Sequence, residues 1–331
     1  MEIISFNSYK GGTCRTTTCY NSLPYLTKTL KATGNNPIIV FDVDLESIGL
    51  THLLHSKMSP TEIKALKYHT QNLFKDTDHP DFDSEAFFRL ILDEKRTYLN
   101  EKFFESFERV GKRLGLDDNA SVLFLSAARD PDFKYDLTIN SNDLLVSKLI
   151  EFFIDVAENF PEYAPAALLF DCASGTQLST MITLGYAKKI VVCTRMSYQS
   201  REGTQYYLTN EISRMFRVKD DAREVFLLPT AVPENPFGTD AASADILDLR
   251  DDAYDGIIRN LIGAVNSRNR ERALKYSFNT SLATEESMGI PELERFKWSE
   301  SLLYSLDRLT EKERVAQTRY ERLAQLIAGG K

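Results

Sequence analysis

The segment IISFNSYKGGTCRTTTCYNSL, residues 3–23, decides the fold of this chain because it joins an apolar run to a glycine turn and a helical pattern. Gly11 and Gly12 form the turn, and Thr16, Thr17 and Thr18 begin the stretch with helical spacing. Such a turn places backbone N–H groups, a helix N-terminus and hydroxyl groups at one point, where together they attract an anion. Glycines let the backbone curl closely around a phosphate. The purely structural alternative is a glycine-rich turn with threonine caps.

The turn departs from the usual phosphate-binding loop, G-x-x-x-x-G-K-[ST], at three positions. Tyr9 and Cys14 stand where this pattern has glycine, and Arg15 stands where it has lysine. Thr16 keeps the hydroxyl group that binds Mg²⁺ in such loops. The added Cβ of Cys14 predicts either a strained loop or a negative φ at this residue. Arginine remains a good phosphate ligand, although its planar fork differs from a compact ammonium group.

Six short apolar runs predict strands that are buried on both faces. They are rich in Val, Ile, Leu and Phe and do not alternate with polar residues, which is typical of parallel sheets. Helical spacing follows the first run at 16–31 and the fifth at 203–216. We therefore predict an α/β fold, a doubly wound, mostly parallel sheet with helices on both faces. The runs are EIISF (2–6), PIIVFDVD (37–44), SVLFLSA (121–127), AALLFDCA (166–173), KIVVCTR (189–195) and EVFLLPTAV (224–232).

Two segments interrupt this alternation of strands and helices. Residues 52–120 are charged and rich in Phe, and they predict a helical insertion between the second and third runs. Residues 240–331 predict a helical C-terminal extension that packs on the main domain, residues 1–239. The last helical pattern has one apolar stripe, which favours packing on the domain or on a partner over membrane binding. The stripe consists of Ala316, Tyr320, Leu323, Ala324 and Ile327.

Three aspartates follow the predicted buried strands. Asp42 and Asp44 end the second run, and Asp171 ends the fourth, where small residues follow. The C-terminal ends of parallel strands form the sheet edge where ligands bind, so we expect these carboxylates near the glycine turn. One such aspartate is commonly a loop cap. Three of them beside a glycine turn favour a ligand-binding edge.

Composition and charge limit the partners and the compartment. The chain has 331 residues, of which 43% are hydrophobic and 27% charged, as in a soluble globular protein. Its net charge of −8 excludes a wholly basic surface but leaves room for a local patch that contacts DNA. No apolar run approaches the roughly 18 residues of a membrane span. Four scattered cysteines and the lack of a basic leader favour a cytoplasmic protein with reduced thiols.

The motifs resemble those of the ParA/MinD group of P-loop ATPases, which have a deviant Walker A loop. YKGGTCRTTTCYNSLPYL (9–26) is similar to K-G-G-x-G-K-[ST] and to the helix that follows it. IIVFDVDLES (38–47) and ALLFDCASG (167–175) resemble the second motif and the Walker B strand of the group. A variant branch with K-G-G-V-G-R and D-x-D-L-E-x-x-G-L is more similar still. The resemblance covers roughly residues 1–50 and 120–235 and implies a P-loop NTPase fold.

The resemblance also implies a role for each matching residue. Lys10 would be the signature lysine, which reaches a partner subunit's phosphates, and Asp44 would position the attacking water; these are the implied catalytic residues. The reaction would be in-line phosphoryl transfer. The implied Mg²⁺ ligands, direct or through water, are Thr16, Asp42 and Asp171. The implied ATP-binding residues are Lys10, Gly11, Gly12, Thr13, Cys14, Arg15, Thr16 and Thr17.

The sequence is compatible with two functions. The first is an ATP-dependent switch that forms a homodimer, hydrolyses ATP slowly with Mg²⁺, and signals to a protein partner or to DNA. The second is a nucleotide-binding regulatory or scaffold subunit with little or no turnover, in a multi-protein system such as phage defence. Because Cys14 and Arg15 depart from the family loop, the sequence supports binding better than turnover. Adenine over guanine is implied by the family alone.

Overall fold

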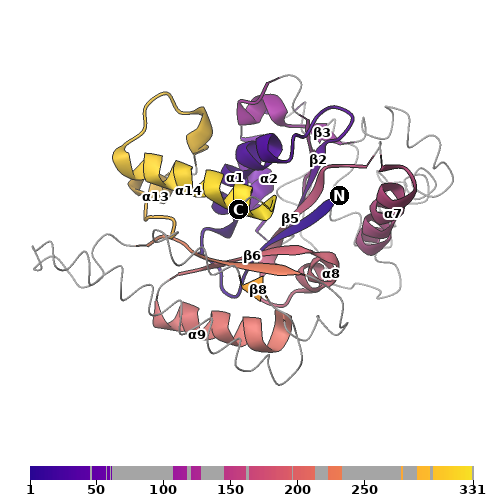
Figure 1. The fold of residues 1–331 in the computed structure, drawn as a ribbon. Coiled ribbons are helices and arrows are strands. Elements are labelled where there is room, and N and C mark those ends of the chain that lie inside the picture. The colour runs from indigo at the N-terminus through magenta and orange to yellow at the C-terminus, as the bar shows by residue number, and fades with distance from the viewer. Residues whose placement is uncertain are drawn as a thin grey trace, which may run out of the picture.

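The computed structural model contains an eight-stranded sheet within its described residues, in the order β3-β4-β2-β5-β1-β6-β7-β8 (Figure 1). All neighbouring strands are parallel except β3 and β4. The strands are β1 (Glu2–Ser8), β2 (Ile38–Val43), β3 (Glu108–Arg109), β4 (Val122–Leu125), β5 (Ala167–Ser174), β6 (Lys189–Thr194), β7 (Glu224–Pro229) and β8 (Ser277–Phe278). The structure describes residues 1–44, 47–56, 58–59, 61, 107–117, 121–127, 145–161, 164–195, 197–212, 223–232, 277–278, 289–298 and 301–329.

All six predicted strands form, as β1, β2, β4, β5, β6 and β7, and the predicted α/β class with a mostly parallel sheet is confirmed. These strands are buried along nearly their whole length because helices cover both faces. The edge strands β3 and β8 were not predicted. Each has two residues and no apolar run, so only pairing with a neighbour makes it a strand.

Alternate residues of each central strand face two hydrophobic clusters on opposite sides of the sheet. In β2, Phe41 and Val43 belong to one cluster, whereas Ile38 and Val40 belong to the other. Figure 1 shows α8 and α9 on the side of the sheet away from α1 and α14. The helices are α1 (Arg15–Thr29), α2 (Gly49–His55), α7 (Leu145–Asn159), α8 (Leu178–Tyr186), α9 (Tyr198–Tyr206), α13 (Glu294–Trp298) and α14 (Glu311–Ile327), with the π-helix η4 (Tyr207–Ile212) and the 3₁₀ helices η2 (Gly111–Leu114) and η5 (Leu303–Ser305).

The C-terminal helix α14 packs against α1 in the second cluster (Figure 1). A capping box starts it, in which Thr310 and Glu313 exchange side-chain and backbone hydrogen bonds. All five residues of the predicted apolar stripe are buried in this cluster. The side chain of Asn21 in α1 accepts a hydrogen bond from the backbone N–H of Leu303 over 2.8 Å. This bond connects α1 to η5, the 3₁₀ helix that precedes α14. No described helix is long and apolar enough to cross a membrane.

The predicted domain boundaries stay predictions. Most of the insertion at 52–120 and residues 240–276 of the C-terminal extension lie outside the described residues. Where the insertion is described, it contains β3 and η2 as well as the end of α2, so it is not helical throughout.

Candidate phosphate-binding site

The loop between β1 and α1 is anchored to the ends of neighbouring strands. The hydroxyl group of Thr230, which follows β7, donates to the carbonyl oxygen of Thr13 over 2.6 Å. The backbone N–H of Gly175, which follows β5, donates to the carbonyl oxygen of Ser8 over 2.8 Å. The position of the loop is therefore set by the sheet itself, whose C-terminal edge lies beneath it.

Two residues of the loop have a left-handed backbone. Gly12 has a φ of 73°, and Cys14 has a φ of 55°. Of the two alternatives predicted for Cys14, the structure has the strained one, because its Cβ disfavours this conformation. Cys14 is also the N-cap of α1, and its side chain makes no capping hydrogen bond. Backbone N–H groups at the start of α1 lack helical acceptors, so this helix terminus favours an anion.

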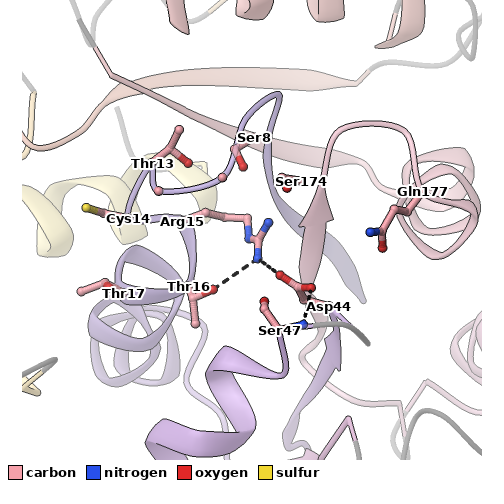
Figure 2. Close-up of a pocket in the computed structure, with 12 residues that line it drawn as sticks. Ser8, Thr13, Cys14, Arg15, Thr16, Thr17, Asp44, Ser47, Ser174 and Gln177 are labelled. Atoms are coloured by element: carbon pink, nitrogen blue, oxygen red, sulfur yellow. Dashed lines mark hydrogen bonds and ion pairs between the residues drawn. The ribbon is translucent and has the colours of Figure 1, made fainter. Parts of the chain in front are cut away.

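A pocket of about 310 Å³ lies on this loop, where β1, β2 and β5 end (Figure 2). This volume is typical of small-ligand sites. All predicted loop residues from Gly11 to Thr17 line the pocket, whereas Lys10, Asp42 and Asp171 are not among its lining residues. The lining residues are Ser8, Gly11, Gly12, Thr13, Cys14, Arg15, Thr16, Thr17, Asp44, Ser47, Ser174 and Gln177.

Four residues of the pocket were not predicted as site residues: Ser8, Ser47, Ser174 and Gln177. Ser174 belongs to the run of small residues after Asp171, and Ser47 lies within the second motif, so the sequence carried a signal for both. Gln177 had no such signal, because its place depends on how α8 begins beside β5. Among the described residues, the hydroxyl oxygen of Ser8 has no hydrogen-bond partner; because it is buried, it is suited to a ligand.

Arg15 connects the loop to the ends of β2 and β5. Its Nε donates to Oδ1 of Asp171 over 2.9 Å, and its Nη2 donates to Oδ2 of Asp44 over 2.5 Å. Nη2 also lies 3.3 Å from the hydroxyl oxygen of Thr16 (Figure 2). The side chains of Arg15, Asp44 and Asp171 are only 7%, 10% and 0% exposed. The residue predicted to bind phosphate thus neutralises two carboxylates in this structure.

Burial and charge act in opposite directions on this cluster. Burial by itself would lower the pKa of Arg15, but the carboxylates of Asp171 and Asp44 raise it above its ordinary value, so the guanidinium stays charged. Burial raises the pKa of Asp171, and the charge of Arg15 counteracts that rise. Oδ2 of Asp171 is buried and has no hydrogen-bond partner in the described part of the chain. Such an unsatisfied oxygen is a natural ligand for a cation.

Asp42 lies deeper than Asp44 and is satisfied by its neighbours. Its Oδ2 accepts hydrogen bonds from the backbone N–H and the hydroxyl of Thr51 over 2.8 and 2.7 Å. Its Oδ1 accepts from the backbone N–H of Asp44 over 3.2 Å. Burial, followed by the charge of Asp171, raises the pKa of Asp42. Asp42 therefore fastens α2 to β2, and its role toward Mg²⁺ stays a prediction.

The outer side of the loop contacts α9. Lys10 is exposed, and its Nζ donates to Oε1 of Gln199 over 2.8 Å. The ring of Tyr9 lies on Gly203, where an added Cβ would come within 2.1 Å of the ring carbon Cδ1. Glycine at this position makes room for the tyrosine that replaces the first loop glycine. The predicted role of Lys10 at a partner's phosphates stays a prediction.

The sequence matches no protein-family model and no curated protein. Among solved structures, the chain is similar to a ParA family ATPase from Chlorobium tepidum TLS, at 13% identity over 98% of each chain, with a TM-score of 0.55. It is also similar to the MinD cell division protein of Aquifex aeolicus, at 13% identity over 98% of this chain and 96% of that one, with a TM-score of 0.52. The chain therefore has the fold of ParA and MinD ATPases, as the resemblance of its motifs predicted.

Proposed function

We propose that this protein binds ATP with Mg²⁺ and works in the cytoplasm as an ATP-dependent dimerising switch with slow hydrolysis, which signals to a protein partner or to DNA. One observation carries the proposal. The loop from Gly11 to Thr17, the uncapped start of α1 and the carboxylate of Asp44 all face a single pocket of about 310 Å³ at the C-terminal edge of the sheet. The shared fold supports it.

Phosphate binding follows from what the pocket offers. The helix start supplies N–H donors and positive potential, and Ser8 supplies a buried hydroxyl to which no described residue forms a hydrogen bond. The Thr13 hydroxyl oxygen is also buried and has no hydrogen-bond partner in the part of the chain that the structure describes. Arg15 is a permanently charged cation in the pocket wall, and its fork matches the geometry of phosphate oxygens.

The residues also fit Mg²⁺, a hard cation that takes oxygen ligands and commonly binds one or two carboxylates together with phosphates. Thr16 offers a hydroxyl group, and Asp171 offers the unsatisfied Oδ2. When bound, the ion would neutralise charge on the phosphates. Asp44, whose Oδ1 accepts the backbone N–H of Ser47 over 3.2 Å, is the residue that we propose to orient the attacking water.

A second function keeps the nucleotide but not the turnover. Two differences from the usual loop sequence favour a regulatory or scaffold subunit. Cys14 has a strained backbone, and Arg15 forms hydrogen bonds with both Asp44 and Asp171. The double variant Cys14→Gly, Arg15→Lys separates the two functions. If Arg15 is an adapted ligand, the variant hydrolyses ATP no faster than the wild type, whereas a large gain indicates a decayed site.

Thermal unfolding of the purified protein with and without ATP and Mg²⁺ tests binding itself. Saturating nucleotide should stabilise the fold by roughly 2 to 4 kcal/mol, because it binds only the folded state. Lys188→Ala provides the matched control, since it removes one exposed positive charge before β6, at the sheet edge opposite the pocket, and should preserve this shift. An unchanged melting temperature at millimolar ATP would remove the nucleotide function.

A further inference from the structure

We propose that Arg15 serves as an internal cation in the nucleotide-free protein, holding Asp44 and Asp171 so that Asp171 and the neighbouring Thr16 take up a divalent ion only after Arg15 has left the carboxylates. The inference adds a resting-state role to the residue that the proposed function assigns to phosphate. It concerns the protein without nucleotide and does not depend on hydrolysis.

The buried carboxylates of Asp44 and Asp171 need a positively charged partner. Asp44 and Asp171 are almost fully buried, and holding a carboxylate charged away from water is costly unless it is paired. Arg15 contacts both carboxylates at once, through Nε on one side and Nη2 on the other. No other salt bridge of the described residues reaches either carboxylate. Arg15 therefore supplies the positive charge that a buried carboxylate pair requires.

Arg15 and a divalent ion would also compete for the same residues, because Arg15 binds Oδ1 of Asp171, next to the unsatisfied Oδ2 of the same carboxylate. Thr16 and Asp171 are the residues that fit Mg²⁺, and Arg15 contacts both of them, at 3.3 Å and 2.9 Å. A cation placed among these oxygens would lie beside the guanidinium and be repelled by it. The carboxylates and the Thr16 hydroxyl thus become available together when Arg15 moves.

A nucleotide phosphate is the group that would move Arg15 away from the carboxylates. A nucleotide phosphate in the pocket offers a fork-shaped set of acceptors to the guanidinium, which can exchange the carboxylates for phosphate oxygens. A lysine ammonium is a compact point charge and lacks the planar fork that contacts both carboxylates here. Nucleotide and divalent ion should therefore bind with strong positive coupling, and linkage requires the coupling to be reciprocal.

Binding of Mn²⁺, followed by electron paramagnetic resonance in the absence of nucleotide, tests this directly. The full-length wild type should bind Mn²⁺ only in the millimolar range. Arg15→Ala and Arg15→Gln should bind it at least tenfold more tightly, because both remove the competing charge. Lys188→Ala removes the same charge at an exposed position before β6, at the sheet edge opposite the pocket, and should leave Mn²⁺ affinity unchanged.

Two further measurements make the result decisive. Adding Asp171→Asn to Arg15→Gln should abolish the gained affinity, and a non-hydrolysable ATP analogue should raise the Mn²⁺ affinity of the wild type at least tenfold. The inference is overturned if the nucleotide-free wild type binds Mn²⁺ as tightly as the Arg15 variants, or as tightly as it does with the analogue. Should Arg15→Ala and Arg15→Gln both fail to fold, tight Mn²⁺ binding by the nucleotide-free wild type would still overturn the inference. If ATP stabilises the wild type but these differences in Mn²⁺ affinity are absent, the inference about Arg15 is wrong and the proposed function is unaffected.

Discussion

The two ends of the phosphate-binding loop are held by opposite kinds of interaction. At its helical end, Arg15 is buried and forms ion pairs with Asp44 and Asp171. At its strand end, Tyr9 is 37% exposed and Lys10 makes one surface hydrogen bond to α9. Buried ion pairs are costly to break on one side, whereas exposed contacts contribute little. The helical end is therefore fixed in the resting protein, and the strand end can rearrange at small cost.

The exposed strand end of the loop nevertheless packs against neighbouring aromatic residues. Tyr9 packs edge-on to Tyr206, with ring centroids 6.4 Å apart, and Tyr206 is itself 51% exposed. Exposed aromatic residues near a ligand pocket are common at protein interfaces. The loop therefore has a charged, buried half beside the pocket and an aromatic, exposed half at the molecular surface. Each of the following changes tests that separation.

Arg15→Ala should have the largest effect on the nucleotide-free protein. It leaves two buried carboxylates without a counter-ion, so the free energy of unfolding should fall by about 3 to 5 kcal/mol. Urea denaturation in the presence of EDTA measures this, with Arg15→Lys as the variant that keeps the charge and loses less. A loss below about 1 kcal/mol would mean that the pairs contribute no more than surface salt bridges do.

Gly203→Ala should have the next largest effect, through the aromatic half. The new methyl group would overlap the ring of Tyr9, and overpacking of this kind costs about 1 to 3 kcal/mol of unfolding free energy. Combined with Tyr9→Ala, the same change should instead stabilise α9 by up to about 1 kcal/mol, because alanine favours a helix. Gly185→Ala in α8, where an added Cβ meets nothing within 4 Å, is the matched control. Equal effects of Gly203→Ala with and without Tyr9 would refute the contact.

Cys14→Gly should stabilise the nucleotide-free protein modestly. A left-handed backbone destabilises the folded state of an L-residue by about 1 to 2 kcal/mol, and glycine removes this strain. Glycine also loses more chain entropy on folding, which offsets roughly 0.5 to 1 kcal/mol of the stabilisation. We expect a net increase of about 0.5 to 1 kcal/mol in the free energy of unfolding, measured by thermal and urea denaturation. Cys14→Ala removes the thiol but keeps the Cβ, and it should show no such increase. If alanine stabilises as much as glycine, backbone strain is not the cause.

Lys10→Ala should have the smallest effect on stability, below about 1 kcal/mol, since it removes one exposed hydrogen bond. Its expected effect lies in assembly. Light scattering with ATP and Mg²⁺ should show a dimer for the wild type and a monomer for the variant. A wild type that remains monomeric under these conditions contradicts the dimeric switch, whatever the stability of the variant.

Much of the fold could be predicted because buried strands and glycine turns have local signatures. The six apolar runs all became strands, and the glycine turn after the first run became the loop that lines the pocket. The stripe from Ala316 to Ile327 is buried in the second cluster, and its spacing alone defines an apolar face. β3 and β8 escaped prediction because two-residue strands form only through pairing.

The candidate site was predicted as a set of residues but not as a set of contacts. The sequence by itself determined that Arg15, Thr16, Asp44 and Asp171 gather at one sheet edge, because each follows or begins an element whose end lies there. Only the tertiary structure decided that Arg15 grips Asp44 and Asp171, that Asp42 is satisfied by Thr51, and that Gly203 receives Tyr9. Local propensity fixes where an element ends. Which buried charge finds which partner depends on desolvation and packing, and these exist only once residues far apart in the chain have been brought together.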